Sequence, residues 1–248
     1  MEQAFFREYA ELEDTHWWFR GRRALLGQVL ESLARPRLRI LDVGFGTGAM
    51  LGFLARYGKP VGMDRSPEAI AFARTRSSLP MIAGDVLHVP LHTASVDLVT
   101  AFDVLEHVDD DAAAVAELAR VCRPGGYVLV TVPAFDFLWG NQDVVSHHRR
   151  RYTRRLLRER VARGGLRIEL LTYFNALLFP LIAAVRMGRR LGGTADAPRS
   201  DFAMTPPGLV NDALAAILGA ERGILKRWSL PLGVSLLCLA RRPEGPRP

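Results

Sequence analysis

The run Arg39-Ile40-Leu41-Asp42-Val43-Gly44-Phe45-Gly46-Thr47-Gly48 begins with apolar residues around a single acid. Such a run is typical of a short strand buried on both faces, which has no polar alternation. Glycine then occupies every second position, where it permits a tight turn and close approach of the backbone to a ligand. Apolar residues at helical spacing follow in residues 50–54, so the turn leads to a helix N-terminus with free N–H groups. Strand, glycine turn and helix predict a nucleotide-type binding site.

The glycine spacing alone does not name the nucleotide. The pattern Gly44-x-Gly46-x-x-Ala49 also satisfies the dinucleotide fingerprint, and Asp64 lies at the right distance for a ribose hydroxyl under either interpretation. Asp42 separates the two, because its carboxylate would crowd a pyrophosphate but suits a ligand that carries an ammonium group.

Composition and charge narrow the class of protein. The 248-residue chain is long enough for one large α/β domain, or for one with an inserted lobe, and 49% of its residues are hydrophobic. Its net charge is +7 and comes almost wholly from arginine, since Lys59 and Lys226 are the only lysines. We favour a composition bias as the cause, and selection for anionic groups is the alternative.

The cysteines and the N-terminal residues indicate a compartment. Cys122 and Cys238 lie in apolar runs without metal-type spacing, which predicts two buried thiols in a reducing compartment. Residues 1–23 carry charges throughout and lack the apolar core of a signal peptide. No run reaches the roughly 18 apolar residues that a membrane-spanning helix needs. We therefore expect a cytoplasmic protein, either soluble or peripheral to the membrane.

Strands and helices alternate through the middle of the chain. After the glycine turn, two short apolar strands end in the acids Asp64 and Asp85, and strand ends in such sheets face the crevice where ligands bind. Residues 96–102 and 127–132 supply a fourth and a fifth strand. Residues 109–111 are three acids before an Ala-rich helix, which predicts solvated helix capping. This rhythm predicts a parallel sheet with right-handed crossovers.

Five motifs follow one another over about residues 38–133: LDVGFGTG, VGMD, AGDVLHVP, DLVTAFDVLEHV and VCRPGGYVLVTVP. Together they resemble the successive motifs of class I S-adenosylmethionine-dependent methyltransferases, most closely the small-molecule branch that includes quinone-biosynthesis methyltransferases. The resemblance implies an α/β, Rossmann-like, seven-stranded and mostly parallel sheet with helices on both faces, a reversed last strand and a helical lid or insertion. Residues 166–173 and 233–240 are the candidates for the last two strands.

The resemblance also implies a cofactor, S-adenosylmethionine, with S-adenosylhomocysteine as product, and no metal. Asp42 would face the ammonium group of the cofactor, and Asp64 would accept both ribose hydroxyls. Asp85 and the Val86 amide would read the adenine edge, with Arg65 along its face. The core residues expected to contact the cofactor are Asp42, Gly44, Phe45, Gly46, Gly48, Asp64, Arg65, Asp85, Val86, Ala101 and Phe102.

Catalytic residues are harder to place. Methyl transfer mainly requires an electron-rich atom aligned with the methyl group, and a base matters when the nucleophile is a hydroxyl or an acidic carbon. His107 would be such a base, or simply part of the structure near the cofactor. Asp143 and His148 would form a carboxylate-oriented base in the substrate loop, or His148 would anchor that loop. The catalytic candidates are His148, His107 and Asp143.

Residues 2–35 have a helical pattern and enclose His16-Trp17-Trp18-Phe19-Arg20-Gly21-Arg22-Arg23. Aromatic rings beside arginines would close over a ligand, in which case Trp18 and Arg23 contact the cofactor. Alternatively, the helix packs on the edge of the domain and its arginines extend into water. The sequence leaves both interpretations open.

The chain divides into five expected segments. They are an N-terminal helical lid at 1–35, a Rossmann-like cofactor-binding core at 36–173, a helical insertion or substrate cap at 174–230, the final core strand at 231–241 and a disordered tail at 242–248. Within the cap, residues 192–208 are rich in Gly, Pro, Ala and Thr, which predicts a mobile loop.

We expect transfer of a methyl group from S-adenosylmethionine to a small, apolar or lipid-like acceptor, with O-, C- or N-methylation undetermined. A nucleic-acid methyltransferase is one alternative, but no motif for a flipped base is present and we expect no nucleic-acid partner. A non-catalytic S-adenosylmethionine-binding protein is another. The apolar run 176–185 and the arginines of residues 149–155 raise a minority hypothesis of peripheral membrane contact, against a simple roof over the substrate pocket. The oligomeric state stays open.

Overall fold

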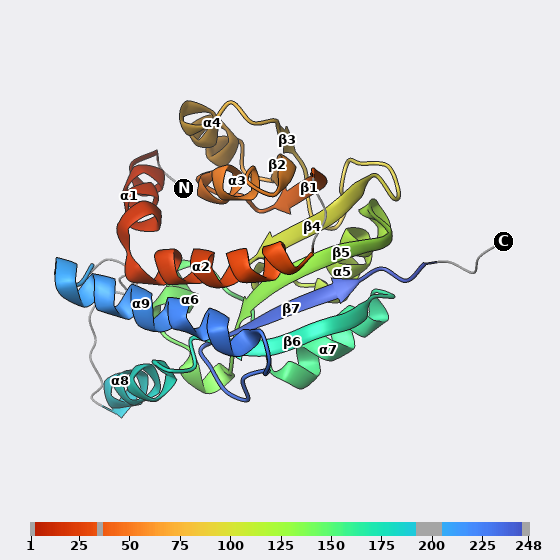
Figure 1. Cartoon of the computed structure of the whole chain (residues 1–248). Coiled ribbons are helices and arrows are strands. Elements are labelled where there is room, and N and C mark those ends of the chain that lie inside the picture. The colour runs from red at the N-terminus through yellow and green to blue at the C-terminus, as the bar shows by residue number, and fades with distance from the viewer. Residues whose placement is uncertain (1–2, 34–36, 192–204, 245–248) are drawn as a thin grey trace.

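The computed structural model describes residues 3–33, 37–191 and 205–244. A central sheet of seven strands has the order β3-β2-β1-β4-β5-β7-β6, in which β7 runs antiparallel to both of its neighbours (Figure 1). The strands are β1 (Leu38–Val43), β2 (Gly58–Asp64), β3 (Met81–Ala83), β4 (Val96–Phe102), β5 (Cys122–Pro133), β6 (Arg167–Phe174) and β7 (Ser235–Arg241). The expected fold class and reversed last strand are confirmed.

Helices cover both faces of this sheet, with α2 and α9 crossing in front of it and α5 and α7 behind it in Figure 1. The helices are α1 (Gln3–Thr15), α2 (Trp17–Ser32), α3 (Ala49–Leu54), α4 (Pro67–Arg76), α5 (Asp111–Val121), α6 (Asn141–Val145), α7 (Arg154–Arg163), α8 (Phe179–Leu191) and α9 (Gly208–Leu225), with 3-10 turns η1 (Leu105–His107) and η2 (Asp136–Leu138). No helix among the described residues is both long and apolar enough to cross a membrane.

Three apolar clusters form the core of the described chain: two large ones on opposite faces of the sheet, and a smaller one around Phe45, Leu51 and Ile70. Beneath α2, the fully buried Leu25 and Leu26 pack with Leu98 of β4 and Leu218 of α9. Gly21 lets α2 and α9 approach closely, because a Cβ on it would lie 2.7 Å from Leu218. Burying such side chains stabilises the fold by roughly 1.5–3 kcal/mol each. Helix α2 is therefore part of the core and not only a cover for a ligand.

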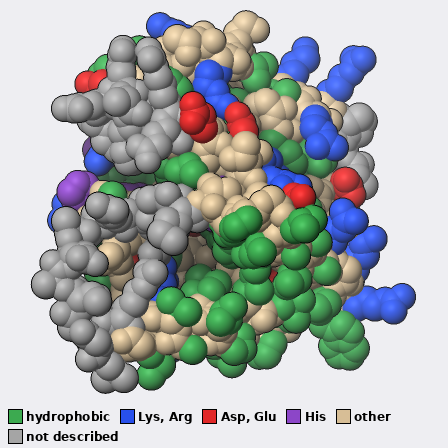
Figure 2. Space-filling model, turned by 90° about the vertical axis from the view of Figure 1, so that its left-hand side faces the viewer, with side chains coloured by type: hydrophobic (Ala, Val, Ile, Leu, Met, Phe, Trp, Pro, Cys, Tyr) green, Lys and Arg blue, Asp and Glu red, His purple; other side chains and the backbone are tan. Residues whose placement is uncertain are grey.

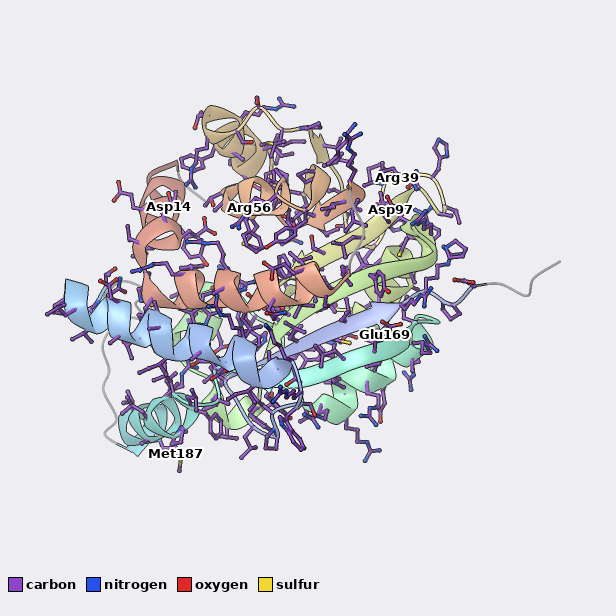
Figure 3. All side chains as sticks on the ribbon, in the orientation of Figure 1. Asp14, Arg39, Arg56, Asp97, Glu169 and Met187 are labelled. Atoms are coloured by element: carbon purple, nitrogen blue, oxygen red, sulfur yellow. The ribbon has the colours of Figure 1, made fainter. Side chains whose placement is uncertain are left out.

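Asp97 of β4 binds Arg39 of β1 at the ends of these strands away from the glycine turn. Its carboxylate accepts bonds from the backbone and the guanidinium of Arg39 at 2.7–3.2 Å, and the two side chains lie side by side in Figure 3. These bonds lower the pKa of Asp97 although burial opposes that shift. The pair fixes the register of β1 and β4, and with it the position of the glycine turn at the other end.

Local details differ from the expectations in three places. The helical pattern of residues 2–35 resolves into α1 and α2, which meet at His16, whose ring nitrogen accepts a bond from the Trp18 amide. Strand β5 starts at Cys122, five residues before the expected start of the fifth strand at residue 127. Asp111 is buried rather than solvated, because Arg150, Arg160 and the Tyr152 hydroxyl all contact its carboxylate.

Several expected boundaries lie outside the described residues. These include residues 34–36 at the edge of the N-terminal segment, most of the expected mobile loop at 192–208, and residues 245–248 of the expected tail. Before them, Arg242 donates bonds to the carbonyls of Ala119, Arg120 and Cys122 at 2.6–3.0 Å. Both cysteines are buried and free, as expected.

Candidate functional site

The turn between β1 and α3 has three glycines with left-handed backbone. Gly44, Gly46 and Gly48 have φ angles of 71°, 56° and 83°, which side chains with a Cβ rarely adopt. A Cβ on Gly44 would lie 2.6 Å from a methyl carbon of Val104, whereas one on Gly46 would have nothing within 4 Å. Gly44 is therefore required for packing, and Gly46 borders open space that is available to a ligand.

Asp42 lies at the end of β1, directly before this turn. Its carboxyl group is buried, and Oδ1 accepts a 2.7 Å bond from the Thr100 hydroxyl. Oδ2 is also buried and has no hydrogen-bond partner among the described residues. Burial raises the pKa of Asp42 to about 7, against the opposing effect of the Thr100 bond. A buried acceptor without a partner destabilises the ligand-free protein, and a ligand with an ammonium group would satisfy it.

Asp64, at the end of β2, is held in a fixed orientation. Its two carboxylate oxygens accept bonds from the amides of Gly46 at 3.0 Å and Ser66 at 2.9 Å. Each oxygen keeps a second lone pair, so the carboxylate can still accept two hydroxyl groups. Further along the same edge, Asp85 accepts the Leu87 amide at 2.8 Å, and Val86 is buried beside it.

Helix α1 lies across the glycine turn. The Glu13 carboxylate accepts a hydrogen bond from the Thr47 hydroxyl, and burial raises the pKa of Glu13 to about 7. Arg76 of α4 holds the same helix through Asp14, at 2.8 Å, and through Glu13, at 3.9 Å. Tyr9 is half-buried near Glu13, and the loss of solvent around its hydroxyl raises its pKa. These contacts close α1 over the turn that leads into α3.

Arg22, which the sequence analysis did not single out, extends from α2 to the ends of β4 and β5. Its guanidinium is buried, 2.9 Å from Asp103 and 3.1 Å from the Thr131 hydroxyl, with the Trp18 ring 4.7 Å away. Asp103 has a φ of 55°, a strained conformation for a residue with a Cβ. Arg23, the expected contact, donates to the Glu13 carbonyl at 2.8 Å. The sequence did contain a signal for burial of Arg22. Arg22 lies four residues after Trp18, so both side chains are on the face of α2 that also carries the buried Leu25 and Leu26.

The loop after β5 brings the catalytic candidates together. Asp143 is fully buried and accepts bonds from His148 Nδ1 at 2.8 Å and from both Nε and Nη2 of Arg151 at 2.8–2.9 Å. Burial opposes ionisation of Asp143, but these bonds outweigh it and hold its pKa well below its usual range. The His107 and His148 rings meet edge to face with centroids 4.8 Å apart. Burial and the neighbouring His148 lower the pKa of His107 to about 4.

Glu106 completes this group and was not among the sequence candidates. Its side chain is fully buried, and neither carboxyl oxygen has a hydrogen-bond partner among the described residues. Burial, and then the neighbouring Asp103, raise its pKa well above the usual range. The Leu-Glu-His-Val motif contained it, but only the fold reveals that the side chain turns inward.

Comparison with known proteins agrees with this geometry. Residues 41–130 match the family model described as "Methyltransferase domain". A probable S-adenosylmethionine-dependent methyltransferase of Mycolicibacterium smegmatis is 33% identical over 49% of this chain and 48% of its own length. A malonyl-[acyl-carrier protein] O-methyltransferase of Serratia marcescens is 31% identical over 65% of this chain and 66% of its own.

The chain belongs to the S-adenosylmethionine-dependent methyltransferases. A ubiquinone biosynthesis O-methyltransferase of Sodalis glossinidius is 36% identical over 36% of this methyltransferase chain and 39% of its own length. The chain spans from 39% to 66% of the length of these three curated relatives. The solved complex between the Haloferax volcanii Trm112 methyltransferase activator and a putative methyltransferase contains a similar fold, with a TM-score of 0.63, 18% identity and coverage of 99% of this chain and 97% of that one.

The residues present fit the cofactor of this family. The unsatisfied Asp42 Oδ2 suits an ammonium group, and the carboxylate of Asp64 is oriented with lone pairs left for two hydroxyls. Gly46 leaves open space between them. The fit extends to the methionine and ribose parts of the molecule.

Proposed function

We propose that this methyltransferase chain transfers the methyl group of S-adenosylmethionine to a small, apolar or lipid-like acceptor. The observation that carries the proposal is the pair of acids at the ends of β1 and β2, with a buried carboxyl oxygen on Asp42 that lacks a partner. A dinucleotide would instead bring a pyrophosphate against Asp42, which its charge disfavours.

The binding roles follow from position along the sheet edge. Asp42 pairs with the ammonium group, and Asp64 accepts the ribose hydroxyls while two amides hold its carboxylate. Asp85 and the Val86 amide take the adenine edge, with Arg65 beside it. Ala101 and Phe102, buried at the end of β4, support the amino acid end. When bound, the cofactor supplies a methyl group on a cationic sulfur.

An aromatic cluster supports an apolar acceptor. Phe135 stacks on Tyr173 with ring centroids 5.0 Å apart and on Phe137 at 5.3 Å, and Phe179 of α8 lies 6.0 Å from it. Large rings from three segments therefore line the side of the molecule next to the substrate loop. The presence of a ubiquinone biosynthesis O-methyltransferase among the relatives supports a ring-bearing acceptor of this kind.

His148 is the residue that we propose as the proton acceptor. The bond from its Nδ1 to Asp143 places the proton on Nδ1 and leaves the lone pair on Nε2. His107 faces it as an uncharged ring, since its pKa lies at about 4. A base held in one tautomer by a buried carboxylate is suited to take a proton from an acceptor hydroxyl.

The test is calorimetry of the purified chain with S-adenosylmethionine and with NADH. We expect saturable binding of S-adenosylmethionine only, and Asp64→Ala should weaken it by about 2–3 kcal/mol through loss of charge-assisted hydrogen bonds. Glu68→Ala, a nearby exposed acid on α4, is the matched control and should change little. Tight NADH binding, or an unaffected Asp64→Ala, would contradict the proposal.

Transfer itself is measured with methyl-labelled cofactor and a panel of phenols, quinols and fatty acids. Label should move into an organic-soluble product with an equal amount of S-adenosylhomocysteine. Cofactor binding without label transfer to any member of the panel would favour a non-catalytic S-adenosylmethionine-binding protein.

A further inference from the structure

Three side chains that typically bind metal ions converge beside the end of β4. Glu106, His107 and His148 each offer one ligand atom, and these atoms all lie within 4.8 Å of one another. Two belong to η1 and the third to the loop after α6, 41 residues further along the chain. The Arg149 amide donates to the Glu106 carbonyl at 2.7 Å, so backbone contact holds the two segments together.

The hydrogen bonds around the two imidazoles leave one lone pair on each. His148 Nδ1 is bonded to the buried Asp143 carboxylate, so its Nε2 carries the lone pair. The His107 ring lies close to the Ser146 backbone, which favours a proton on the ring nitrogen nearest that backbone and a lone pair on the other nitrogen. Metal-binding histidines typically have this arrangement, with the second ring nitrogen donating to a carboxylate or a carbonyl.

The fold of the described residues provides no partner for the buried carboxyl group of Glu106. It is fully buried, and both of its oxygens lack a hydrogen-bond partner among the described residues. Leaving such a group unsatisfied costs about 1–3 kcal/mol, and more when it is charged. A cation between the carboxylate and the imidazoles would satisfy it. Nearby, Arg22 pairs with Asp103, and Arg151 pairs with Asp143.

We infer that Glu106, His107 and His148 bind a divalent transition-metal ion, with Zn²⁺ as the best match. Two imidazoles and one carboxylate form a known zinc ligand set that leaves a position open for a further ligand. Bonds of about 2.0–2.2 Å at tetrahedral angles place the ligand atoms about 3.4 Å apart. The ligand atoms here lie within 4.8 Å of one another, so side-chain rotations must bring them closer to close the site. The proposal departs from the sequence-based expectation that no metal is bound.

The open position also narrows the acceptor, and this part rests on the proposed methyl transfer. Two of the metal ligands, Glu106 and His107, come shortly after the end of β4, whose Ala101 and Phe102 border the proposed cofactor site. A hydroxyl or phenol oxygen of the acceptor would be the fourth ligand, and the cation would lower the pKa of that hydroxyl. In the metal-bound chain His148 Nε2 is a ligand and no longer the proton acceptor, so the hydroxyl proton would leave to water. The structure therefore favours O-methylation of a hydroxyl-bearing acceptor over C- or N-methylation.

The test is titration of the full chain, first treated with a chelator, with Zn²⁺ and with Co²⁺. We expect one Zn²⁺ per chain by calorimetry and elemental analysis, and a visible Co²⁺ absorption band from a site of low coordination number. Glu106→Gln, which keeps the side-chain shape, and His148→Ala should weaken Zn²⁺ binding at least 10-fold and abolish the Co²⁺ band. The control His147→Asn changes the adjacent exposed histidine, whose φ of 55° asparagine tolerates, and should retain both signals.

The outcomes separate the metal site from the proposed function. Circular dichroism of each variant shows whether it is folded, and His107→Ala replaces any ligand variant that is not. Zn²⁺ binding well below one equivalent, or equal binding by folded ligand variants, would overturn the metal site. If Zn²⁺ binds but its removal leaves label transfer unchanged, the acceptor role is overturned. Failure to bind S-adenosylmethionine would instead refute the proposed function, whatever the metal titration gives.

Discussion

At the scale of single residues, Asp42 couples ligand binding to pH. Its raised pKa of about 7 means that the carboxyl group is mostly neutral at pH 6 in the ligand-free protein. A cationic ammonium group prefers the ionised form, so affinity for S-adenosylmethionine should rise with pH by up to about 10-fold per unit below pH 7 and level off above it. Calorimetry at pH 5.5, 6.5 and 7.5 measures this change.

The same shift has a consequence for stability, with the opposite sign. Because the folded-state pKa lies above the usual value of 3.8, the ligand-free protein should lose stability as pH rises from about 4 to 7. In both measurements the variant Asp42→Asn identifies the titrating group, and it should remove most of the pH dependence of S-adenosylmethionine affinity. Burial also raises the pKa of Glu13 to about 7, so Glu13→Gln is the necessary second variant. If Glu13→Gln alone removes the pH dependence, the titrating group is Glu13 and not Asp42.

At the scale of elements, α1 is held over the glycine turn mainly by polar contacts. Arg76 of α4 reaches Asp14 and Glu13, and Glu13 accepts from Thr47. Asp14 lies at the inner side of α1 facing α3 and α4 in Figure 3. These contacts stabilise the position of α1 over the glycine turn only modestly, because ion pairs that are partly exposed contribute about 0–1 kcal/mol.

We therefore expect Arg76→Ala to speed the release of S-adenosylmethionine up to about fivefold without unfolding the protein. Stopped-flow fluorescence of the tryptophans in α2 would follow release, and amide exchange at residues 9–15 should be faster in the variant. Arg74→Ala changes the neighbouring arginine of the same helix and should leave the release rate unaltered. Equal rates in all three proteins would mean that α1 does not close over the cofactor.

The elements that sequence predicted well are those with a local signal. The strand, turn and helix around Gly44, and the acids that end β2 and β3, were recognised because short buried strands and left-handed glycines have strong patterns. Arg22 and Glu106 were missed, since burial of a charge depends on which elements pack against it. Asp111 was wrongly taken as solvated, because its three partners lie 39–49 residues further along the chain.

At the scale of the whole molecule, the arginine-rich loop is not a free basic surface. Arg151 is buried against Asp143, Arg150 pairs with Asp111, and Arg154 donates to the Leu230 carbonyl. These arginines brace the substrate loop against the core. Replacing all of residues 149–151 by alanine would therefore damage the loop, since removing one partner of a buried ion pair costs about 3–5 kcal/mol. Such a variant cannot test contact with a membrane.

Exposed apolar side chains gather instead on the helical cap, and Figure 2 shows a broad hydrophobic area on the face that it presents. The described side chains of the cap that are at least 46% exposed are Leu177, Leu181, Val185, Met187, Leu209, Val210 and Trp228, and Leu232, just after the cap, is 51% exposed. Met187 points away from the sheet in Figure 3. Helix α8 thus has one face toward the aromatic cluster and a second apolar face toward solvent. If α8 only covered the substrate pocket, its outer face would not need to be apolar.

We expect this outer face, and not the arginine-rich loop, to carry any contact with a bilayer. In co-sedimentation with anionic vesicles, Leu181→Glu combined with Met187→Glu should reduce the bound fraction at least fivefold, because two charges replace side chains that are 61% and 54% exposed. Arg149→Ala, which removes an exposed arginine without touching Asp143, should change binding less than twofold. If the bound fraction falls strongly with salt but is unchanged by the two glutamates, the arginines make the contact with the bilayer and the apolar face does not. If the unaltered protein stays in the supernatant at low salt, contact with a bilayer is contradicted and the acceptor should be sought among soluble molecules.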